Sequence, residues 1–159
     1  MTQETHLPSL PQSPHNPLPA APQDRKLQEL FLAAKEAMKN AYSPYSGFRV
    51  GAAVRLSDGA IFAGCNIENA SYGASNCAER VAIQNASSQR GQIVIEDVVV
   101  ITDAPVPWPP CGLCRQVIAE FGLNARIHLA NLSGIDQSLD FQELFPQSFN
   151  PQFLKKTQP

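Results

Sequence analysis

Three of the four cysteines are spaced in a way that favours metal binding. Cys111 and Cys114 form a Cys-x-x-Cys pair, and Cys77 stands upstream, two residues before Glu79. Each group lies where a helix is expected to begin, and the free N–H groups and partial positive charge of a helix N-terminus favour the thiolate, the form that binds metal. Three thiolates suit a tetrahedral Zn²⁺ ion and leave a fourth position open.

The fourth cysteine decides between a structural and a catalytic site. If Cys65 closed the coordination sphere, four thiols would form an inert cage, and the protein could be a structural interaction module. Eleven residues separate Cys65 from Cys77, whereas structural cages commonly pair two short knuckles. A lone cysteine in a strand is more often a small core residue. Spacing therefore favours the open three-thiol site and leaves the closed cage as an alternative.

Glu79 is the candidate acid and base. It lies too far round the helix from Cys77 to bind the metal from the same face, yet it can reach the open position. A water on zinc is acidified toward neutral pH, and a neighbouring carboxylate can take its proton and pass it to a leaving group. A solvated glutamate in a first helical turn is the alternative. Arg80 and, less strongly, Arg115 could hydrogen-bond the sulfurs and offset their negative charge, or could be ordinary surface residues.

Length and charge exclude several classes of protein. The chain has 159 residues, 12 Lys and Arg against 14 Asp and Glu, and a formal net charge of −2. This length predicts one domain, and the absence of a long basic run argues against a nucleic-acid partner. The N-terminus has no basic segment followed by an apolar one, and no apolar run reaches about 18 residues. We therefore expect a cytoplasmic protein with reduced thiols and no membrane partner.

The N-terminal segment differs in composition from the remainder. Six of the 14 prolines fall in residues 1–23, and most other residues there are polar or small. Such a segment cannot bury enough surface to offset its ordering entropy, so we predict a disordered tail over 1–23. A Pro-rich docking ligand for some partner is the alternative.

The elements that must position the cysteines alternate along the chain. Apolar periodicity, β-branched runs and turn residues predict a three-layer α/β architecture, with helices on both faces of a mixed sheet. The expected elements are a helix from Asp24 to before Ser43, a hairpin of Val50 to Leu56 and Ile61 to Asn66 around Asp58-Gly59, a helix from near Cys77 to before Gly91, a strand Val98 to Thr102, a helix Gly112 to Phe121, a short strand Ile127 to Ala130 and a helical turn Phe141 to Phe145.

The motifs resemble one known family. Cys-Ala-Glu followed by Pro-Cys-x-x-Cys is similar to the zinc deaminase signature, in which a glutamate that does not bind zinc is the acid and base. A single Cys-x-x-Cys is weak evidence, but an ordered set of segments resembles the small homotetrameric cytidine deaminases over roughly residues 24 to 155. These segments are Ala41 to Ala53, Gly64 to Ala70, Cys77 to Arg80, Pro110 to Gln116 and Glu143 to Phe149.

The resemblance implies a fold and an activity. The fold would be a three-layer α-β-α domain over 24–155 with a mixed five-stranded sheet. One zinc ion per chain would be bound by Cys77, Cys111 and Cys114, and Glu79 would shuttle the proton. The activity would be hydrolytic deamination of cytidine and 2′-deoxycytidine to uridine and 2′-deoxyuridine in pyrimidine salvage, by a homotetramer with sites shared between subunits.

The resemblance also implies a nucleoside pocket. Phe48 would pack against the nucleoside, while Asn66 and Glu68 would hydrogen-bond the ribose 3′-hydroxyl. An acidic side chain accepts hydroxyl donors and repels a phosphate, which suits a neutral nucleoside. The remaining implied contacts are the Ala78 N–H to the base carbonyl, the residue 109 carbonyl to the departing amine, Tyr45 in the pocket lining and Phe149 from a neighbouring subunit.

The chain departs from the family pattern at a few positions. Pro109 stands where Ser or Thr is expected, Trp108 beside it is unusual, and Asn76 replaces a more usual apolar residue. Two related activities remain as alternatives. Deamination of an aminonucleoside antibiotic would share the zinc chemistry but not the Asn-Ile-Glu-Asn segment, and a polynucleotide-editing deaminase would need a basic, aromatic-lined channel.

Overall fold

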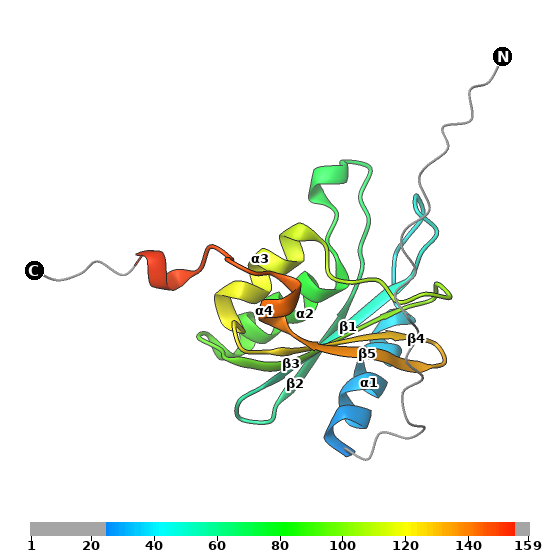
Figure 1. The fold of residues 1–159 in the computed structure, drawn as a ribbon. Helices are drawn as coiled ribbons and strands as arrows, with labels where there is room; N and C mark the ends of the chain where they lie inside the picture. Colours follow the sequence, from blue (N-terminus) through cyan, green and yellow to red (C-terminus); the bar gives the residue numbers. More distant parts are fainter. Residues whose placement is uncertain (1–24, 155–159) are drawn as a thin grey trace, which may run out of the picture.

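The computed structural model describes residues 25–154 and shows a mixed β-sheet with helices on both faces. Figure 1 shows α1 on one side of the sheet and α2 and α3 on the other. The predicted tail at 1–23 lies outside the described residues. The elements are α1 Arg25–Met38, β1 Val50–Leu56, β2 Ile61–Cys65, a 3-10 turn Tyr72–Ala74, α2 Ala78–Arg90, β3 Ile95–Thr102, α3 Gly112–Phe121, β4 Arg126–Asn131, β5 Gly134–Asp140, α4 Phe141–Leu144 and a 3-10 turn Pro151–Leu154.

The five strands lie in the order β2-β1-β3-β4-β5. β1 is antiparallel to both β2 and β3, β3 is parallel to β4, and β4 is antiparallel to β5. The parallel pair is joined by α3, as a crossover between parallel strands requires. This arrangement confirms the three-layer α/β fold with a mixed five-stranded sheet.

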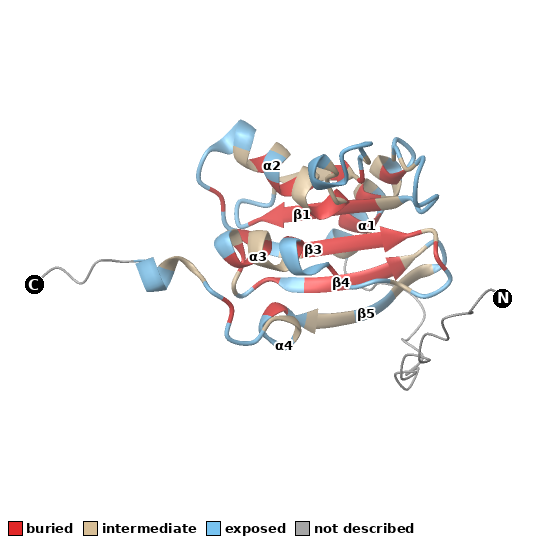
Figure 2. Ribbon diagram, turned by 90° about the horizontal axis from the view of Figure 1, so that it is seen from above, coloured by how far each residue is buried: buried red, intermediate tan, exposed pale blue. Residues whose placement is uncertain are grey.

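The central strands are buried on both faces, because each face is covered by helices. In β3, Val98 and Val100 pack with the residues of α2 and α3, whereas Val99 and Ile101 pack with those of α1. Figure 2 shows this burial concentrated in β1, β3 and β4. A β-branched run without polar alternation is typical of such a doubly covered strand.

Two glycines let the helices approach the sheet closely. A Cβ atom on Gly51 would lie 2.1 Å from the carbonyl oxygen of Ala34 in α1. A Cβ atom on Gly64 would lie 2.6 Å from the backbone nitrogen of Ala82 in α2 and 2.8 Å from the Cβ of Val81. Any side chain at Gly64 would push α2 away from β2, so this residue helps to place the N-terminus of α2, where the candidate ligands lie.

The structure confirms the predicted hairpin, the three main helices and the strands predicted at Val98 to Thr102 and Ile127 to Ala130, with shifts of a few residues at their ends. The fifth strand, β5, was expected only from the resemblance and not from the local pattern. Within residues 25–154, no helix combines the length and the apolar character that crossing a membrane would need.

A polar row, buried at Arg55 and His128 and half-buried at Asp97 and Ser138, crosses four strands on the face that α1 covers. Arg55 in β1 donates to Asp97 in β3 over 2.7 Å, and Asp97 lies 3.0 Å from the Nε2 atom of His128 in β4. The Nδ1 atom of His128 lies 2.7 Å from the hydroxyl oxygen of Ser138 in β5. These contacts connect the edge strand β5 to the centre of the sheet.

Candidate active site

The three predicted ligand cysteines meet at the N-termini of two helices. Cys77 is the N-cap residue of α2, Cys111 is the N-cap residue of α3, and Cys114 lies in the first turn of α3. The Sγ atoms of Cys77 and Cys111 are 3.8 Å apart, those of Cys111 and Cys114 are 3.5 Å apart, and all three lie within 4.8 Å of one another. The close approach of α2 and α3 therefore gathers the three thiols into one cluster.

The thiol cluster has the dimensions of a tetrahedral zinc site. Zn–S bonds of about 2.3 Å at tetrahedral angles place two sulfur atoms about 3.8 Å apart. The sulfur distances of 3.8 and 3.5 Å are close to that value. Among the described residues, the side chains near enough to share one ion are Cys77, Cys111 and Cys114, and Cys65 is not with them. The group fits a zinc site with three thiolates and an open fourth position, and it does not support the closed four-cysteine cage.

The cluster favours a thiolate at Cys77. Hydrogen bonding from Cys114, together with that from Cys111 and the positive charge of Arg80, lowers the pKa of Cys77 to about 5 although burial opposes the shift. The pKa of Cys114 is raised, because its thiol donates to Cys77 and is itself buried. Burial also raises the pKa of Cys65, in contrast to that of Cys77. Cys65 lies at the end of β2 and is the strand residue that was predicted.

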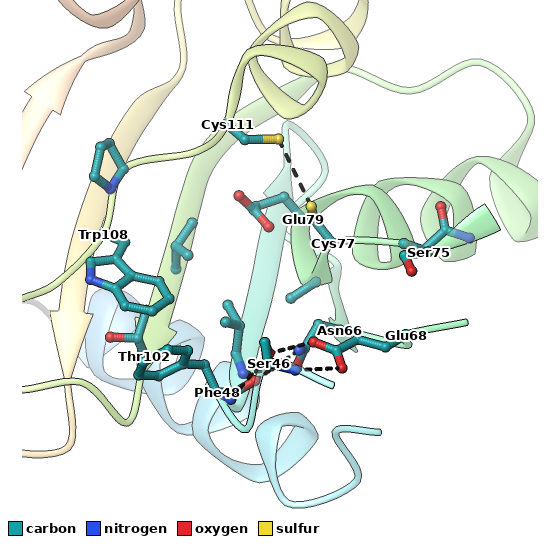
Figure 3. A pocket seen from close by; sticks show the side chains of 15 residues that line it. Ser46, Phe48, Asn66, Glu68, Ser75, Cys77, Glu79, Thr102, Trp108 and Cys111 are labelled. Carbon is teal, nitrogen blue, oxygen red and sulfur yellow. Dashed lines mark hydrogen bonds between the residues drawn. The ribbon is translucent and has the colours of Figure 1, made fainter. Parts of the chain in front are cut away.

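Glu79 is a buried carboxyl group beside the thiols. It occupies the first turn of α2 and is only 4% exposed. Figure 3 shows its carboxyl group turned toward the same space as the sulfur atoms of Cys77 and Cys111. Burial raises the pKa of Glu79 to about 7, and the negative charge of Cys77 adds to the rise. A carboxyl group with this pKa can both hold and release a proton near neutral pH.

A cavity of about 280 Å³ opens beside the thiols and Glu79. Its volume is close to the lower limit of about 300 Å³ for small-molecule sites. No lysine or arginine of the described part of the chain lines it. The predicted residues that line it are Phe48, Asn66, Glu68, Cys77, Ala78, Glu79, Pro109 and Cys111.

Asn66 and Glu68 hold the segment that carries Phe48. The Asn66 side chain accepts from the backbone N–H of Val50 over 2.9 Å and donates to the carbonyl oxygen of Phe48 over 2.9 Å. Glu68 accepts from the backbone N–H of Tyr45 over 2.8 Å and from the N–H and hydroxyl group of Ser46. The hydrogen bond from the Ser46 hydroxyl is the main reason that the pKa of Glu68 is lowered. Both side chains therefore shape the pocket, and their contact with a ribose stays a prediction.

Two residues that the resemblance places in the pocket do not line the cavity within one chain. The ring of Tyr45 is half exposed and packs edge-on against Tyr72, with ring centroids 5.8 Å apart. Phe149 is 57% exposed and stacks on Phe153. An exposed position is what a residue directed to another subunit requires, but the role of Phe149 stays a prediction.

The two arginines beside the cysteine motifs differ in their contacts. Arg80 donates to the carbonyl oxygen of Ser75 over 2.7 Å, and its Nε atom is buried without a hydrogen-bond partner. Its charge acts on Cys77, as described above. Arg115 instead donates to the carbonyl oxygens of Pro110 and Leu144 over 2.8 and 2.9 Å. Arg115 thus ties α3 to the loop before it and to α4, while Arg80 is placed to offset thiolate charge.

The cavity lining also contains residues that the motifs did not single out as site residues. These are Ser46, Val50, Ser75, Asn76, Val100, Thr102 and Trp108. Asn76 exchanges two backbone hydrogen bonds of 2.9 Å with Ile67, which fixes the strand-like approach to Cys77. In the sequence, Trp108 and Asn76 were identified as departures from the family pattern but were given no role in the site. For Trp108, the available signal was its position next to Pro109, whose carbonyl was expected in the pocket.

Comparisons with known proteins agree with this geometry. The family model described as "Cytidine and deoxycytidylate deaminase zinc-binding region" matches residues 24–130. A cytidine deaminase of Halalkalibacterium halodurans is 46% identical over 123 residues, which cover 77% of this chain and 92% of that protein. A cytidine deaminase of Sporosarcina psychrophila is 42% identical over 129 residues, covering 80% and 94%.

Solved structures give the same result. The crystal structure of cytidine deaminase from Burkholderia pseudomallei superposes with a TM-score of 0.71 at 41% identity, covering 77% of this chain and 98% of that one. The crystal structure of cytidine deaminase from Mycobacterium tuberculosis superposes with a TM-score of 0.67 at 31% identity, covering 79% and 98%.

Proposed function

The chain belongs to the cytidine and deoxycytidylate deaminase family, and on that premise we propose that it catalyses the hydrolytic deamination of cytidine and 2′-deoxycytidine. Water adds at C4 of the cytosine ring and the 4-amino group leaves as ammonia, which gives uridine or 2′-deoxyuridine. One observation carries the proposal. The buried carboxyl group of Glu79 lies with three clustered thiols at the wall of a cavity of nucleoside size.

Cys77, Cys111 and Cys114 are the residues that would hold one zinc ion per chain. Their sulfur distances match a tetrahedral ion, and Arg80 offsets part of the negative charge of three thiolates. Zinc bound there would lower the pKa of a coordinated water molecule toward neutrality.

Glu79 moves the proton in this proposal. Deamination requires a proton at N3 of the ring when water adds to C4, and another at the amine when it leaves. A carboxyl group with a pKa of about 7 is protonated in part of the population near neutral pH and can perform both transfers. Its burial keeps competing bulk water away from the proton being moved.

Two backbone groups would orient the base. Ala78 is the first residue of α2, so its N–H has no partner within the helix and can donate to the 2-carbonyl oxygen of cytosine. Pro109 has no N–H, but its carbonyl oxygen can accept from the departing amine. Both residues line the cavity.

The sugar would lie at the end of the cavity that Phe48, Asn66 and Glu68 form. A carboxylate can accept hydrogen bonds from ribose hydroxyls, and the lowered pKa of Glu68 keeps it charged. A phosphate would face the negative charge of Glu68 with no lysine or arginine in the lining to balance it. We therefore propose that the enzyme acts on nucleosides and not on nucleotides or polynucleotides.

We extend the proposal to a homotetramer that acts in pyrimidine salvage in the cytoplasm. Exposed apolar side chains near the site and between Phe149 and Leu154 support association between chains, since clustered exposed apolar groups mark protein–protein contacts. These are Leu113 at 66%, Phe149 at 57%, Phe153 at 70% and Leu154 at 70% exposure. Phe149 would then complete the site of a neighbouring subunit.

A substrate panel tests the proposed function. Purified protein with bound zinc is incubated with cytidine, 2′-deoxycytidine, cytidine 5′-monophosphate, cytosine and adenosine, and the ultraviolet spectrum is followed. We expect turnover of the two cytosine nucleosides and little or none of the other three compounds. An unchanged cytidine spectrum with one zinc ion per chain would refute the proposal.

A further inference from the structure

The indole ring of Trp108 forms one wall of the cavity. It is 39% exposed, lines the cavity and packs edge-to-face on Phe48, with ring centroids 4.6 Å apart and an interplanar angle of 69°. In Figure 3 it lies across the cavity from Glu68 and Ser75. Edge-to-face pairs of this kind fix the orientation of both rings. One flank of the cavity is thus aromatic, and the opposite flank is polar.

The loop that carries Trp108 is held at both ends. Four of the eight residues from Asp103 to Pro110 are prolines. The carbonyl oxygen of Pro105 accepts from the Asn131 side chain over 2.8 Å, and the carbonyl oxygen of the fully buried Pro110 accepts from Arg115 over 2.8 Å. A loop restricted in this way holds its indole in place before a ligand binds, which reduces the entropic cost of contact.

The chemistry of cytosine relates this wall to one edge of the base. C4 of the ring lies between N3 and C5. With N3 at Glu79 and the 4-amino group at the carbonyl oxygen of Pro109, C5 lies on the side of the ring away from Glu79. The residue that precedes Pro109 in the cavity wall is Trp108.

We propose that Trp108 contacts the bound pyrimidine along its C5 edge and determines which substituents at C5 the enzyme accepts. The proposal rests on the proposed function, because the orientation of the base follows from the roles of Glu79 and Pro109. Hydrogen at C5 leaves room for the indole, whereas a bulky substituent meets a ring that Phe48 and the anchored loop prevent from moving aside. Trp108 is in these terms a specificity-determining residue and not an acid, base or ligand.

Kinetics of two substrates test the steric part of the proposal. The ratio of kcat/KM for cytidine to kcat/KM for 5-iodocytidine is measured for the zinc-containing wild-type protein and for the variants Trp108→Val, Trp108→Phe and Val106→Ala. The electronic effect of iodine on the ring is the same in each protein, so a change in the ratio reports the steric effect of the cavity wall. Val106 lies in the same loop, is 60% exposed and does not line the cavity, which makes it the matched control.

We expect the ratio to fall about tenfold in Trp108→Val, the scale on which one hydrophobic contact discriminates substrates. Trp108→Phe should give an intermediate ratio, and Val106→Ala should keep the wild-type ratio. Zinc content and circular dichroism show whether each variant is folded. A ratio in folded Trp108→Val equal to that of wild type, with cytidine turned over normally by wild type, would overturn this inference and leave the proposed function intact.

Tryptophan fluorescence gives a second readout that does not depend on turnover. Trp108 is the only tryptophan of the chain. Titration of wild-type protein with the product uridine, with excitation where uridine does not absorb, should change its emission in a saturable way. Emission that stays constant while uridine competitively inhibits the reaction would contradict contact with the base. If cytidine is not turned over at all, the proposed function fails, and an emission response would still place the indole at a nucleoside site.

Discussion

The contact between Gly64 and α2 predicts that a single methyl group outside the thiol cluster and the cavity lining will disturb the site. In Gly64→Ala the new Cβ atom would lie 2.6 Å from the backbone nitrogen of Ala82 and 2.8 Å from two atoms of the Val81 side chain. Because backbone cannot turn aside as a flexible side chain can, α2 must move away from β2. Overpacking of this kind costs about 1–3 kcal/mol, and for a chain of this size each kcal/mol lowers the melting midpoint by about 2–4 °C. We expect a loss of about 2–12 °C.

The displacement also reaches the chemistry, because α2 begins at the thiol cluster. Cys77 caps the helix and Glu79 lies in its first turn, so a shift of α2 changes the distance from Cys77 to Cys111 in α3. We expect weaker zinc retention and lower kcat for cytidine in Gly64→Ala. Gly73→Ala is the matched control, since a Cβ atom there meets nothing within 4 Å and the backbone conformation is one that alanine adopts.

The assays are differential scanning calorimetry, zinc content after dialysis against a weak chelator, and cytidine turnover, each on both variants beside wild type. A Gly64→Ala protein with wild-type melting midpoint, zinc content and turnover would refute the reasoning that this close contact places α2. Equal losses in Gly73→Ala would refute it as well.

Two further substitutions test the polar row and the sugar end of the cavity. Burial raises the pKa of Asp97, but hydrogen bonds from His128 and Arg55 outweigh it and hold the pKa below 3.8. The stabilisation is therefore present above about pH 4 and lost as the pH falls through the lower folded value. Asp97→Asn should cost about 3–5 kcal/mol at pH 7, because the Arg55 charge stays buried, and urea unfolding should show this cost shrinking below pH 4; a pH-independent cost would contradict the assignment. Glu68→Gln should raise kcat/KM for cytidine 5′-monophosphate relative to cytidine, and an unchanged ratio in steady-state assays would remove phosphate exclusion from Glu68.

The thiol cluster was the part of the site that local sequence predicted best. Helix N-termini can be recognised from residue pattern, and Cys77 and Cys111 are N-cap residues as expected. Once the N-termini of α2 and α3 converge, the three thiols lie close enough to bind one metal ion. The burial of Glu79 was less accessible to prediction, because it depends on the packing of α2 on β1 and β2.

The edge strand β5 shows why part of the fold was not visible locally. Its sequence Gly-Ile-Asp-Gln-Ser-Leu-Asp has few β-branched residues and is largely half exposed. It pairs with β4 across the short connection of residues 132–133, and Ser138 contacts His128, which lies ten residues away. Local propensity carries little information about such an edge strand.

The aromatic wall was missed as a site feature because its two rings come from distant segments of the chain. Phe48 and Trp108 are far apart in sequence and meet because the loop before β1 and the loop after β3 converge where Val50 pairs with Thr102. The contacts of Arg115 were also outside the reach of spacing, since its partner Leu144 belongs to the segment after β5. Loop paths that depend on the assembled sheet cannot be inferred from residue types along one segment.

Glu79→Gln in zinc-containing protein tests the central claim most directly, with cytidine turnover and bound zinc measured on the same sample. Glutamine keeps the size of the side chain and cannot transfer the proton. We expect one zinc ion per chain, as in wild type, and a fall in kcat of about 10²–10⁴-fold. A variant that retains zinc and turns over cytidine at the wild-type rate would contradict the proton-transfer role of Glu79, and loss of zinc would show that Glu79 supports the ligand site instead.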